Sequence, residues 1–312
     1  ELMHEAGLPK EVLALLPGDG AQVGSVVTSD SRIAGVAFTG STQTAHIINR
    51  ALAARDGAIA PMIAETGGQN AMIVDSTALP EQVIKDVVHS AFQSAGQRCS
   101  ALRVLFVQED IAERVLELLK GAMAELNIGN PGYRSTDVGP VIDAEARTGL
   151  QQHIDKMKAA GRLIAETKLP AELDGYFIAP VAFRLDSISE LDKEQFGPVL
   201  HVVTWRNKDL DKIIDEINAT GFGLTLGIHS RNEDTAEHID ARVRIGNVYV
   251  NRNQIGAVVG VQPFGGQGLS GTGPKAGGPH YLLRFVTERT RTINTTAVGG
   301  NASLLSLGDG EP

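Results

Sequence analysis

Short apolar runs alternate with longer amphipathic segments along most of this 312-residue chain. The apolar runs predict buried strands at residues 33–38, 61–64, 71–74, 102–107, 163–165, 177–183, 200–205, 224–229 and 246–250. The amphipathic segments predict helices at residues 43–55, 80–95, 112–126, 144–160, 210–219 and 233–243. Strands that alternate with helices in this way indicate an α/β fold with parallel strand pairing.

Two stretches near the end of the chain depart from this alternation. Residues 254–271 form a long glycine-rich loop that also carries Phe264 and the apolar pair Val258-Val259. Flexible linkers rarely carry such side chains, so we expect an ordered, functional loop. Residues 287–296 alternate charged residues with Thr and Ile, which predicts an exposed or intersubunit strand. We expect the Gly/Ser/Asp-rich residues 297–312 to form a mobile tail.

Composition narrows the class of protein. Hydrophobic residues make up 42% of the chain and charged residues 21%, which is typical of a globular protein. The net charge of −9 argues against a general nucleic-acid or anionic-membrane surface. No apolar run approaches the roughly 18 residues of a membrane span. A single cysteine cannot form an internal disulfide, and the eight histidines show no paired ligand spacing, so we expect no metal site. Because no membrane span is predicted, we expect a cytoplasmic protein.

Cys99, the only cysteine, is the first candidate for chemistry. A lone cysteine is more often a small buried apolar residue than a nucleophile. Here it follows a predicted helix and precedes a predicted strand. Gly96 allows the backbone to approach a ligand closely, and Arg98 could help to hold a thiolate.

Two glutamates in glycine-containing loops complete the candidate chemistry. Glu65 precedes Thr66-Gly67-Gly68, and Glu194 begins Glu194-Gln195-Phe196-Gly197-Pro198. An isolated turn carboxylate is usually only solvated. Together with Cys99, however, a carboxylate could activate water against a thioester that forms on the sulfur.

The stretch from Ile33 to Arg55 predicts a strand, a Gly/Ser/Thr turn and a helix. Free N–H groups at such a helix start attract the phosphates of a dinucleotide. The alternative is that Ser41 or Thr42 serves only as a helix N-cap. If a dinucleotide binds, the cofactor performs the redox step, and Glu194 would suit a ribose diol.

Five motifs in a fixed order then reveal a resemblance. They are Phe38-Thr39-Gly40-Ser41-Thr42, Glu65-Thr66-Gly67-Gly68, Gly96-Gln97-Arg98-Cys99, Glu194-Gln195-Phe196-Gly197-Pro198 and Pro263-Phe264-Gly265-Gly266. Together they resemble the aldehyde dehydrogenase superfamily. Within it the chain is similar to the glutamate γ-semialdehyde (pyrroline-5-carboxylate) dehydrogenases, through Ser100, Gly256-Ala257-Val258-Val259-Gly260 and Gly277-Gly278-Pro279-His280-Tyr281. The segment from Thr287-Glu288-Arg289-Thr290-Arg291-Thr292 through Gly299-Gly300-Asn301 resembles the C-terminal region of the bifunctional proline utilisation A proteins.

The resemblance implies an NAD-dependent oxidation of L-glutamate γ-semialdehyde to glutamate. Cys99 would be the nucleophile, with its own N–H in the oxyanion hole, and Glu65 would be the deacylation base. Thr39, Gly40 and Ser41 would lie near the pyrophosphate of NAD.

The same resemblance implies the remaining contacts. Glu194 would bind the nicotinamide ribose, and Phe196 would pack at the nicotinamide end. The Ser100 hydroxyl and the backbone of Gly256 and Ala257 would hold the substrate α-carboxylate, while Phe264 packs on its aliphatic part. In that subfamily a serine can stand in place of Ala257, whose methyl group offers no hydrogen bond.

The expected architecture is aldehyde-dehydrogenase-like. Residues 1–67 would be the C-terminal part of a Rossmann-type NAD-binding domain, 68–271 an α/β catalytic domain, and 272–312 a C-terminal segment with an oligomerisation strand. The family's upstream tryptophan-asparagine and lysine-bearing segments have no counterpart here, so we expect the C-terminal part of a longer enzyme. A homo-oligomer is expected, and a proline dehydrogenase domain could be fused upstream.

Three alternatives stay open at this point. The chain could be a non-catalytic fragment or oligomerisation module of such an enzyme. It could oxidise another aldehyde. It could also pass the thioester to coenzyme A, although Glu65 favours hydrolysis because a carboxylate base suits attack by water.

Overall fold

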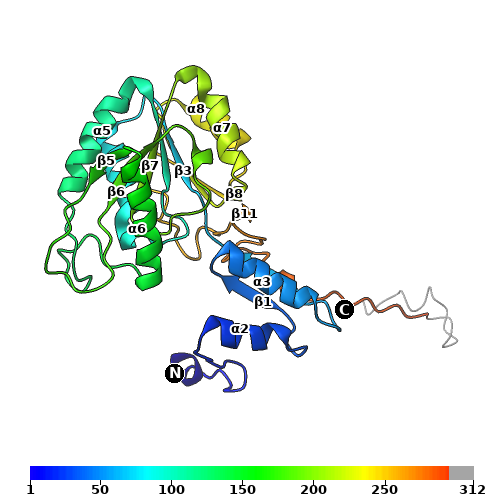
Figure 1. The fold of residues 1–312 in the computed structure, drawn as a ribbon. Helices are drawn as coiled ribbons and strands as arrows, with labels where there is room; N and C mark the ends of the chain where they lie inside the picture. Colours follow the sequence, from blue (N-terminus) through cyan, green and yellow to red (C-terminus); the bar gives the residue numbers. More distant parts are fainter. Residues whose placement is uncertain (295–312) are drawn as a thin grey trace.

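The computed structural model describes residues 1–294, and its centre is a seven-stranded sheet (Figure 1). The strands lie in the order β10, β9, β3, β4, β7, β6, β5, and every neighbouring pair is parallel except β5 and β6. The predicted α/β fold with parallel pairing is confirmed. The strands are β3 (Ala71–Val74), β4 (Val104–Gln108), β5 (Leu163–Glu166), β6 (Val181–Leu185), β7 (Val199–Trp205), β9 (Thr225–His229) and β10 (Asn247–Val250).

The main hydrophobic core lies between this sheet and the helices around it. Every residue of β3, β4 and β9 is buried, as expected for parallel strands whose two faces are covered by helices. The helices supply apolar faces; Val115 and Leu119 of α5, for example, are fully buried. The helices are α4 (Pro80–Phe92), α5 (Glu109–Ala124), α6 (Ala144–Ala159), α7 (Leu210–Ala219) and α8 (Glu233–Arg242).

A second, smaller unit precedes the main sheet and projects from it in Figure 1. Strands β1 (Val36–Thr39) and β2 (Met62–Glu65) pair in parallel and are joined by α3 (Thr42–Ala53). Helices α1 (Leu2–Glu5) and α2 (Gly20–Ser29) come before them. The buried cluster of this unit consists only of Ala45, Leu52, Met62 and Ala64.

The glycine-rich loop returns from the main sheet to this small unit. Gly271 forms an antiparallel bridge with Glu65 at the end of β2, and Thr272 N donates to Ala64 O over 2.9 Å. On the way, β11 (Gln267–Gly268) pairs with β8 (Phe222–Gly223). The loop is therefore ordered, as predicted, because its backbone pairs with two separate strands.

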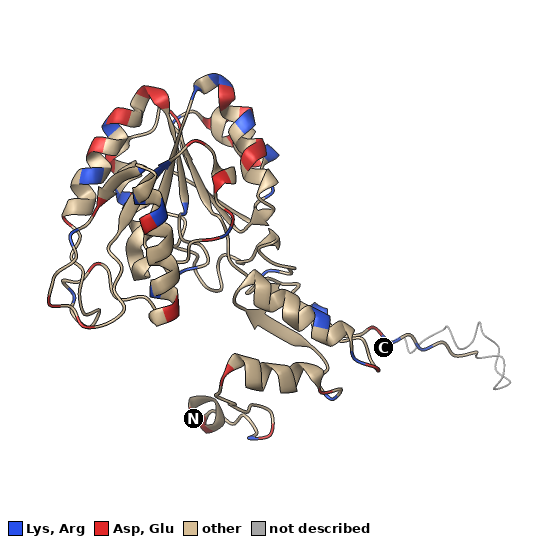
Figure 2. Ribbon diagram, in the orientation of Figure 1, with Lys and Arg blue, Asp and Glu red and all other residues tan. Residues whose placement is uncertain are grey.

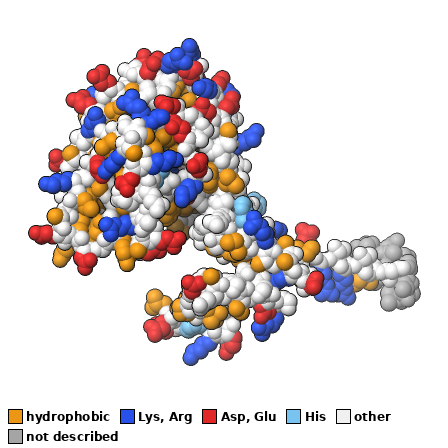
Figure 3. All heavy atoms as spheres, in the orientation of Figure 1, with side chains coloured by type: hydrophobic (Ala, Val, Ile, Leu, Met, Phe, Trp, Pro, Cys, Tyr) orange, Lys and Arg blue, Asp and Glu red, His pale blue; other side chains and the backbone are white. Residues whose placement is uncertain are grey.

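Short helical turns fill several connections: η1 (Gln93–Gly96), η2 (Ile188–Glu190), η3 (Asn207–Asp209) and η4 (Leu282–Phe285). Among residues 1–294 no helix has the length and apolar content that a membrane crossing requires. Acidic and basic residues are interspersed along the outer helices in Figure 2 and on the face shown in Figure 3.

Several predicted boundaries differ from the structure, among them the following. The helix expected to end at residue 95 ends at Phe92 and continues as η1. The strand expected at 177–183 is β6 and begins only at Val181, because Pro180 has no N–H to donate to a sheet ladder. Residues 287–294 of the expected oligomerisation strand form no strand in this single chain.

A strand needs a partner for its hydrogen bonds, so an intersubunit strand stays a prediction. Residues 295 and 296 of that strand and the expected mobile tail lie outside the described residues. The expected domain limits also stay predictions, although the first one, after residue 67, falls between β2 of the small sheet and β3 of the main sheet.

Candidate active site

The predicted motifs meet because of the strand order. The Glu65-Thr66-Gly67-Gly68 loop leads into β3, the Cys99 loop into β4, and the Glu194 loop into β7. These three strands are adjacent and parallel, so their amino ends lie at one edge of the sheet. Segments 126 residues apart touch there: the Gly68 N–H donates to Glu194 Oε2 over 3.2 Å.

A left-handed turn presents Cys99. Ser94, Ala95 and Gly96 have φ values of 55°, 53° and 65°, a region that favours glycine. Only Gly96 fits at the third position, because a Cβ there would collide with the carbonyl of Gly197. The turn ends α4 sharply and lets the chain reverse into β4, which leaves Cys99 half-buried at the sheet edge.

The electrostatic setting of Cys99 favours the neutral thiol in this structure. Burial raises the pKa of Cys99, and the negative charges of Glu194 and Glu65 raise it further, while backbone N–H groups of Ser100 and Cys99 lower it. Arg98 does not play the expected part. Its guanidinium donates instead to Ser94 Oγ over 3.2 Å and to Ile255 O over 3.4 Å.

Asn70, which the sequence did not single out, fixes the loop around Cys99 from below. Its side-chain amide donates to the carbonyls of Cys99, over 2.6 Å, and Ala101, over 2.9 Å. Its own Oδ1 accepts the N–H of Thr225, over 3.2 Å. The side chain is buried, so these bonds are protected from water and hold the nucleophile loop on the sheet.

Glu65 combines burial with an unused acceptor. Its Oε2 accepts the Gly266 N–H over 3.1 Å, whereas Oε1 is buried without a hydrogen-bond partner. Burial raises the pKa of Glu65 to about 7, against opposing effects of Gly266 and Lys275. A Cβ at Gly265 would come within 2.5 Å of Oε1, so this position needs glycine. The carboxylate can therefore exchange a proton near neutral pH.

Glu194 is held on both oxygens. Oε1 accepts two bonds from Arg103, at 2.9 and 3.2 Å, and Oε2 accepts the Gly68 N–H. Burial raises the pKa of Glu194, while the Arg103 charge and hydrogen bond lower it. Phe196 next to it is 44% exposed and lies under the Arg103 guanidinium, 5.2 Å from its carbon.

The residues expected to bind substrate come from two loops that touch. Gln254, fully buried, donates to Ser100 O over 3.4 Å and leads directly into Gly256 and Ala257. Arg252 donates to Gly256 O over 3.0 Å. This bond uses the carbonyl of Gly256 and not its N–H. Phe264 is half-buried and exchanges two backbone bonds with Ala276, at 3.0 and 2.9 Å.

The expected pyrophosphate residues lie at the end of β1, beside Glu65. Thr39 pairs with Glu65 in the small sheet, and Gly40 N donates to Glu65 O over 3.1 Å. Ser41 is the N-cap of α3, and its hydroxyl accepts the Thr44 N–H over 3.0 Å. The structure therefore assigns Ser41 the capping role that the sequence left open, next to the exposed backbone of Thr39 and Gly40.

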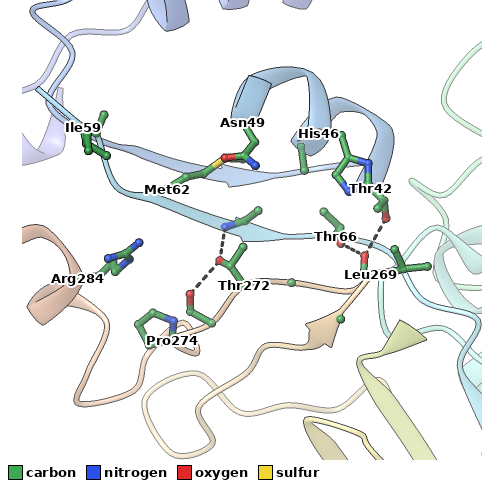
Figure 4. Close-up of a pocket in the computed structure, with 16 residues that line it drawn as sticks. Thr42, His46, Asn49, Ile59, Met62, Thr66, Leu269, Thr272, Pro274 and Arg284 are labelled. Carbon is green, nitrogen blue, oxygen red and sulfur yellow. Dashed lines mark hydrogen bonds between the residues drawn. The ribbon is translucent and has the colours of Figure 1, made fainter. Parts of the chain in front are cut away.

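A separate pocket of about 560 Å³ lies between α3, β2 and residues 268–274 (Figure 4). Thr42 and Thr66 both donate to Leu269 O across it, over 2.9 and 2.6 Å. Thr66 faces this pocket because side chains alternate along an extended chain, whereas the preceding Glu65 turns toward Gly266. Cys99, Glu65 and Glu194 do not line it.

The structure also adds residues that sequence analysis missed. Chief among them is Arg103, which forms an ion pair with Glu194, while the absence of a side chain at Gly67 leaves room for Glu194 Oε2. The signal for Arg103 was present, since it is a charged residue directly before the apolar run of β4. Among residues 1–294 no group of three or more His, Cys, Asp or Glu side chains could hold a metal ion.

Comparison with known proteins agrees with this arrangement. The profile of the aldehyde dehydrogenase family matches residues 1–291. The bifunctional protein PutA of Klebsiella aerogenes is 54% identical over 297 residues, which cover 92% of this chain and 23% of that protein. A crystal structure of a PutA mutant from Bradyrhizobium japonicum superposes with a TM-score of 0.91 at 60% identity, over 95% of this chain and 30% of that one.

A shorter relative points the same way. The 1-pyrroline-5-carboxylate dehydrogenase from Thermus with bound NAD has a TM-score of 0.85 at 37% identity, over 91% of this chain and 55% of that one. The chain thus spans between about a quarter and little more than half the length of these relatives. Because the family profile covers nearly all of it, this chain belongs to the aldehyde dehydrogenase family.

Proposed function

We propose that this chain carries the nucleophile, base and ribose-binding residues of an NAD-dependent dehydrogenase that oxidises L-glutamate γ-semialdehyde to glutamate. The observation that carries the proposal is the meeting of Cys99, Glu65 and Glu194 at one sheet edge, through loops that lead into three adjacent strands. The names of the relatives, 1-pyrroline-5-carboxylate dehydrogenase and PutA, support the substrate.

The residues present fit NAD. Glu194 already accepts three hydrogen bonds, yet a carboxylate has about four acceptor positions and its side chain is 15% exposed, so a ribose hydroxyl can still donate to it. The exposed ring of Phe196 lies beside it for apolar contact. When bound, NAD supplies a hydride acceptor. The solved Thermus relative with bound NAD supports the same cofactor.

The protein's part in the reaction begins at Cys99. Its thiol releases a proton to solvent, the sulfur adds to the aldehyde carbon, and the carbonyl oxygen becomes an oxyanion next to the Cys99 N–H. Hydride loss from that carbon leaves a thioester on the sulfur. The Ser100 hydroxyl and the N–H groups of Gly256 and Ala257 hold the α-carboxylate, while Phe264 contacts the aliphatic chain.

Glu65 completes the cycle. Its unpaired Oε1 can accept a proton from water, which attacks the thioester and releases glutamate and the Cys99 thiol. A pKa of about 7 lets Glu65 take up that proton and return it to solvent at neutral pH. Hydrolysis rather than transfer to coenzyme A is favoured because the acceptor is buried and suited to a molecule as small as water.

The test is NADH formation by the purified chain, and by the chain within a polypeptide as long as its relatives, given NAD and glutamate γ-semialdehyde. We expect Cys99-dependent turnover and at least 10-fold lower kcat/KM for butanal, which lacks the α-carboxylate. Turnover that survives Cys99→Ala would overturn the nucleophile. Equal kcat/KM for the two aldehydes would overturn the substrate, and absence of NADH from both polypeptides would overturn the activity.

The proposal also covers the assembly and the domain organisation of the protein. We infer a homo-oligomer that uses the C-terminal strand, and the two PutA relatives support a fused proline dehydrogenase domain in the whole protein. The domain division at residues 67 and 271 is inferred in the same way. Sedimentation of the purified chain with and without residues 287–312 tests the first inference; an unchanged oligomeric state would contradict it.

A further inference from the structure

We propose that Arg103 is a positioning residue that joins the nucleophile loop to the Glu194 loop and counters part of the negative charge of Glu194 beside the Cys99 sulfur. The inference rests on the proposed role of Cys99, but not on the identity of the aldehyde or the cofactor.

Arg103 uses all five of its N–H groups. Nε and Nη2 donate to Glu194 Oε1, at 3.2 and 2.9 Å. Nη1 donates to the carbonyls of Gly96, at 2.7 Å, and Gly197, at 3.2 Å, and Nη2 donates also to that of Arg98, at 3.1 Å. The guanidinium thus binds both loops at once, two carbonyls on the Cys99 side and two groups on the Glu194 side.

The backbone of Arg103 is fixed independently of its side chain. Its N–H donates to Asn70 O over 2.9 Å, and its carbonyl accepts the His201 N–H over 2.9 Å. It lies directly before β4, between Asn70, which directly precedes β3, and His201 on β7. The residue is 1% exposed. Lysine has only three donors, so at this position it would keep the positive charge but could not make all five of these hydrogen bonds.

The positive charge of Arg103 also affects the chemistry of Cys99. Of the negative charges that raise the pKa of Cys99, Glu194 has the larger effect and Glu65 the smaller. The charge and hydrogen bonds of Arg103 lower the pKa of Glu194, against the burial that raises it. Without Arg103 the pKa of Glu194 would rise further. In the alkaline range where Cys99 titrates, however, the carboxylate would be ionised and uncompensated beside the sulfur, and thiolate formation would become harder.

Other charged groups around Cys99 do not replace Arg103. Glu65, at the end of β2, adds negative charge. Tyr249 on β10 is itself affected by Cys99 and pairs through its ring with Arg252. Arg98 is directed to Ser94 and Ile255. Among the described residues, Arg103 is the one cation in an ion pair with Glu194.

The experiment measures alkylation of Cys99 by iodoacetamide as a function of pH, which is specific because the chain has a single cysteine. We expect Arg103→Gln to move the midpoint of the rate profile upward by about 0.5–1 pH unit. Arg103→Lys, which keeps the charge, should lie nearer the wild type. The exposed Arg114→Gln on α5 is the matched control and should leave the midpoint unchanged.

The double variant Arg103→Gln/Glu194→Gln separates charge from folding. If Arg103 acts by neutralising Glu194, removing both charges should bring the midpoint to the wild-type value or below it. A midpoint that is the same in Arg103→Gln and wild type would overturn the proposal, and so would a double variant with a midpoint as high as the single one. Because alkylation needs neither aldehyde nor NAD, the result is independent of the proposed dehydrogenase activity.

Discussion

Two half-buried carboxylates lie at the same end of the main sheet, and their surroundings differ. Glu194 accepts three hydrogen bonds, two from a guanidinium, whereas Glu65 accepts one backbone N–H and leaves Oε1 unpaired. Burial raises the pKa of both, but only Glu194 has a cation in an ion pair to oppose it. A paired carboxylate suits a fixed anion that binds a ligand, and an unpaired one suits proton transfer.

Among the variants that test this contrast between the two carboxylates, Glu65→Gln should have the largest effect. Without a base for water, deacylation should slow by roughly 10²–10³-fold, while the first hydride transfer still gives about one equivalent of NADH per site. A burst followed by slow turnover, measured by stopped-flow absorbance, is the expected result. Full steady-state turnover in this variant would remove Glu65 from the role of base.

Glu194→Gln should act on binding instead. An amide keeps the size of the side chain but loses the charge that strengthens a hydrogen bond to a ribose hydroxyl. We expect KM for NAD to rise roughly 10-fold, because a charge-assisted hydrogen bond is worth about 1.5–3 kcal/mol, and the burst to remain followed by normal deacylation. If Glu194→Gln instead stalled after one turnover, the roles of the two carboxylates would have to be exchanged.

Glu65 and Glu194 also show how much of the site could be predicted from the sequence. Both were found from their neighbours, Gly67 and Gly68 for one and Phe196-Gly197 for the other, because glycines beside a carboxylate mark a loop that approaches a ligand. Their meeting with Cys99 was reached only through the family resemblance. It depends on β3, β4 and β7 being adjacent, and that order is set by long-range packing rather than by local pattern.

Sequence analysis missed the residues that hold the site in place, for a similar reason. Arg103 stands in an apolar context and shows its partner only when β4 and β7 are paired. The left-handed backbone at Ser94 and Ala95 was missed because neither residue type favours it, and the helix was extended through them. The C-terminal strand was predicted from alternation alone, which a single chain cannot satisfy without a partner strand.

A smaller effect is expected from Gly67→Ala. This variant tests the position of Glu194, because it moves the carboxylate without changing its charge. The added Cβ would collide with Oε2, so the carboxylate must leave the Gly68 N–H. We expect a several-fold rise in KM for NAD and a loss of roughly 1–3 kcal/mol in the free energy of unfolding. Gly121→Ala in α5, where a Cβ meets nothing within 4 Å, is the matched control. Equal behaviour of the two variants would show that Glu194 has room to move.

The pH dependence of deacylation should follow Glu65. Its pKa of about 7 means that the base is protonated, and inactive, below that value. The single-turnover rate of thioester hydrolysis should therefore rise about 10-fold per pH unit below 7 and level off above it. A rate that does not change between pH 5.5 and 8 would show that another group activates the water.

The smallest expected effect is on stability, and it follows from the same raised pKa. Below about pH 4.5 Glu65 is protonated in the folded and the unfolded chain, so wild type and Glu65→Gln should be equally stable. Between pH 4.5 and 7 the folded chain binds more protons than the unfolded chain, so the wild type loses stability as pH rises, while the variant does not. After allowance for solvent screening of this half-buried group, the difference above pH 7 should be roughly 1–2 kcal/mol, or about 2–6 °C in Tm. Thermal unfolding at pH 5 and pH 8 measures it, with the exposed Glu113→Gln on α5 as control. A variant less stable than the wild type at pH 8 would mean that the ionised carboxylate is stabilised by contacts stronger than its one bond to Gly266, and the contrast with Glu194 would fail.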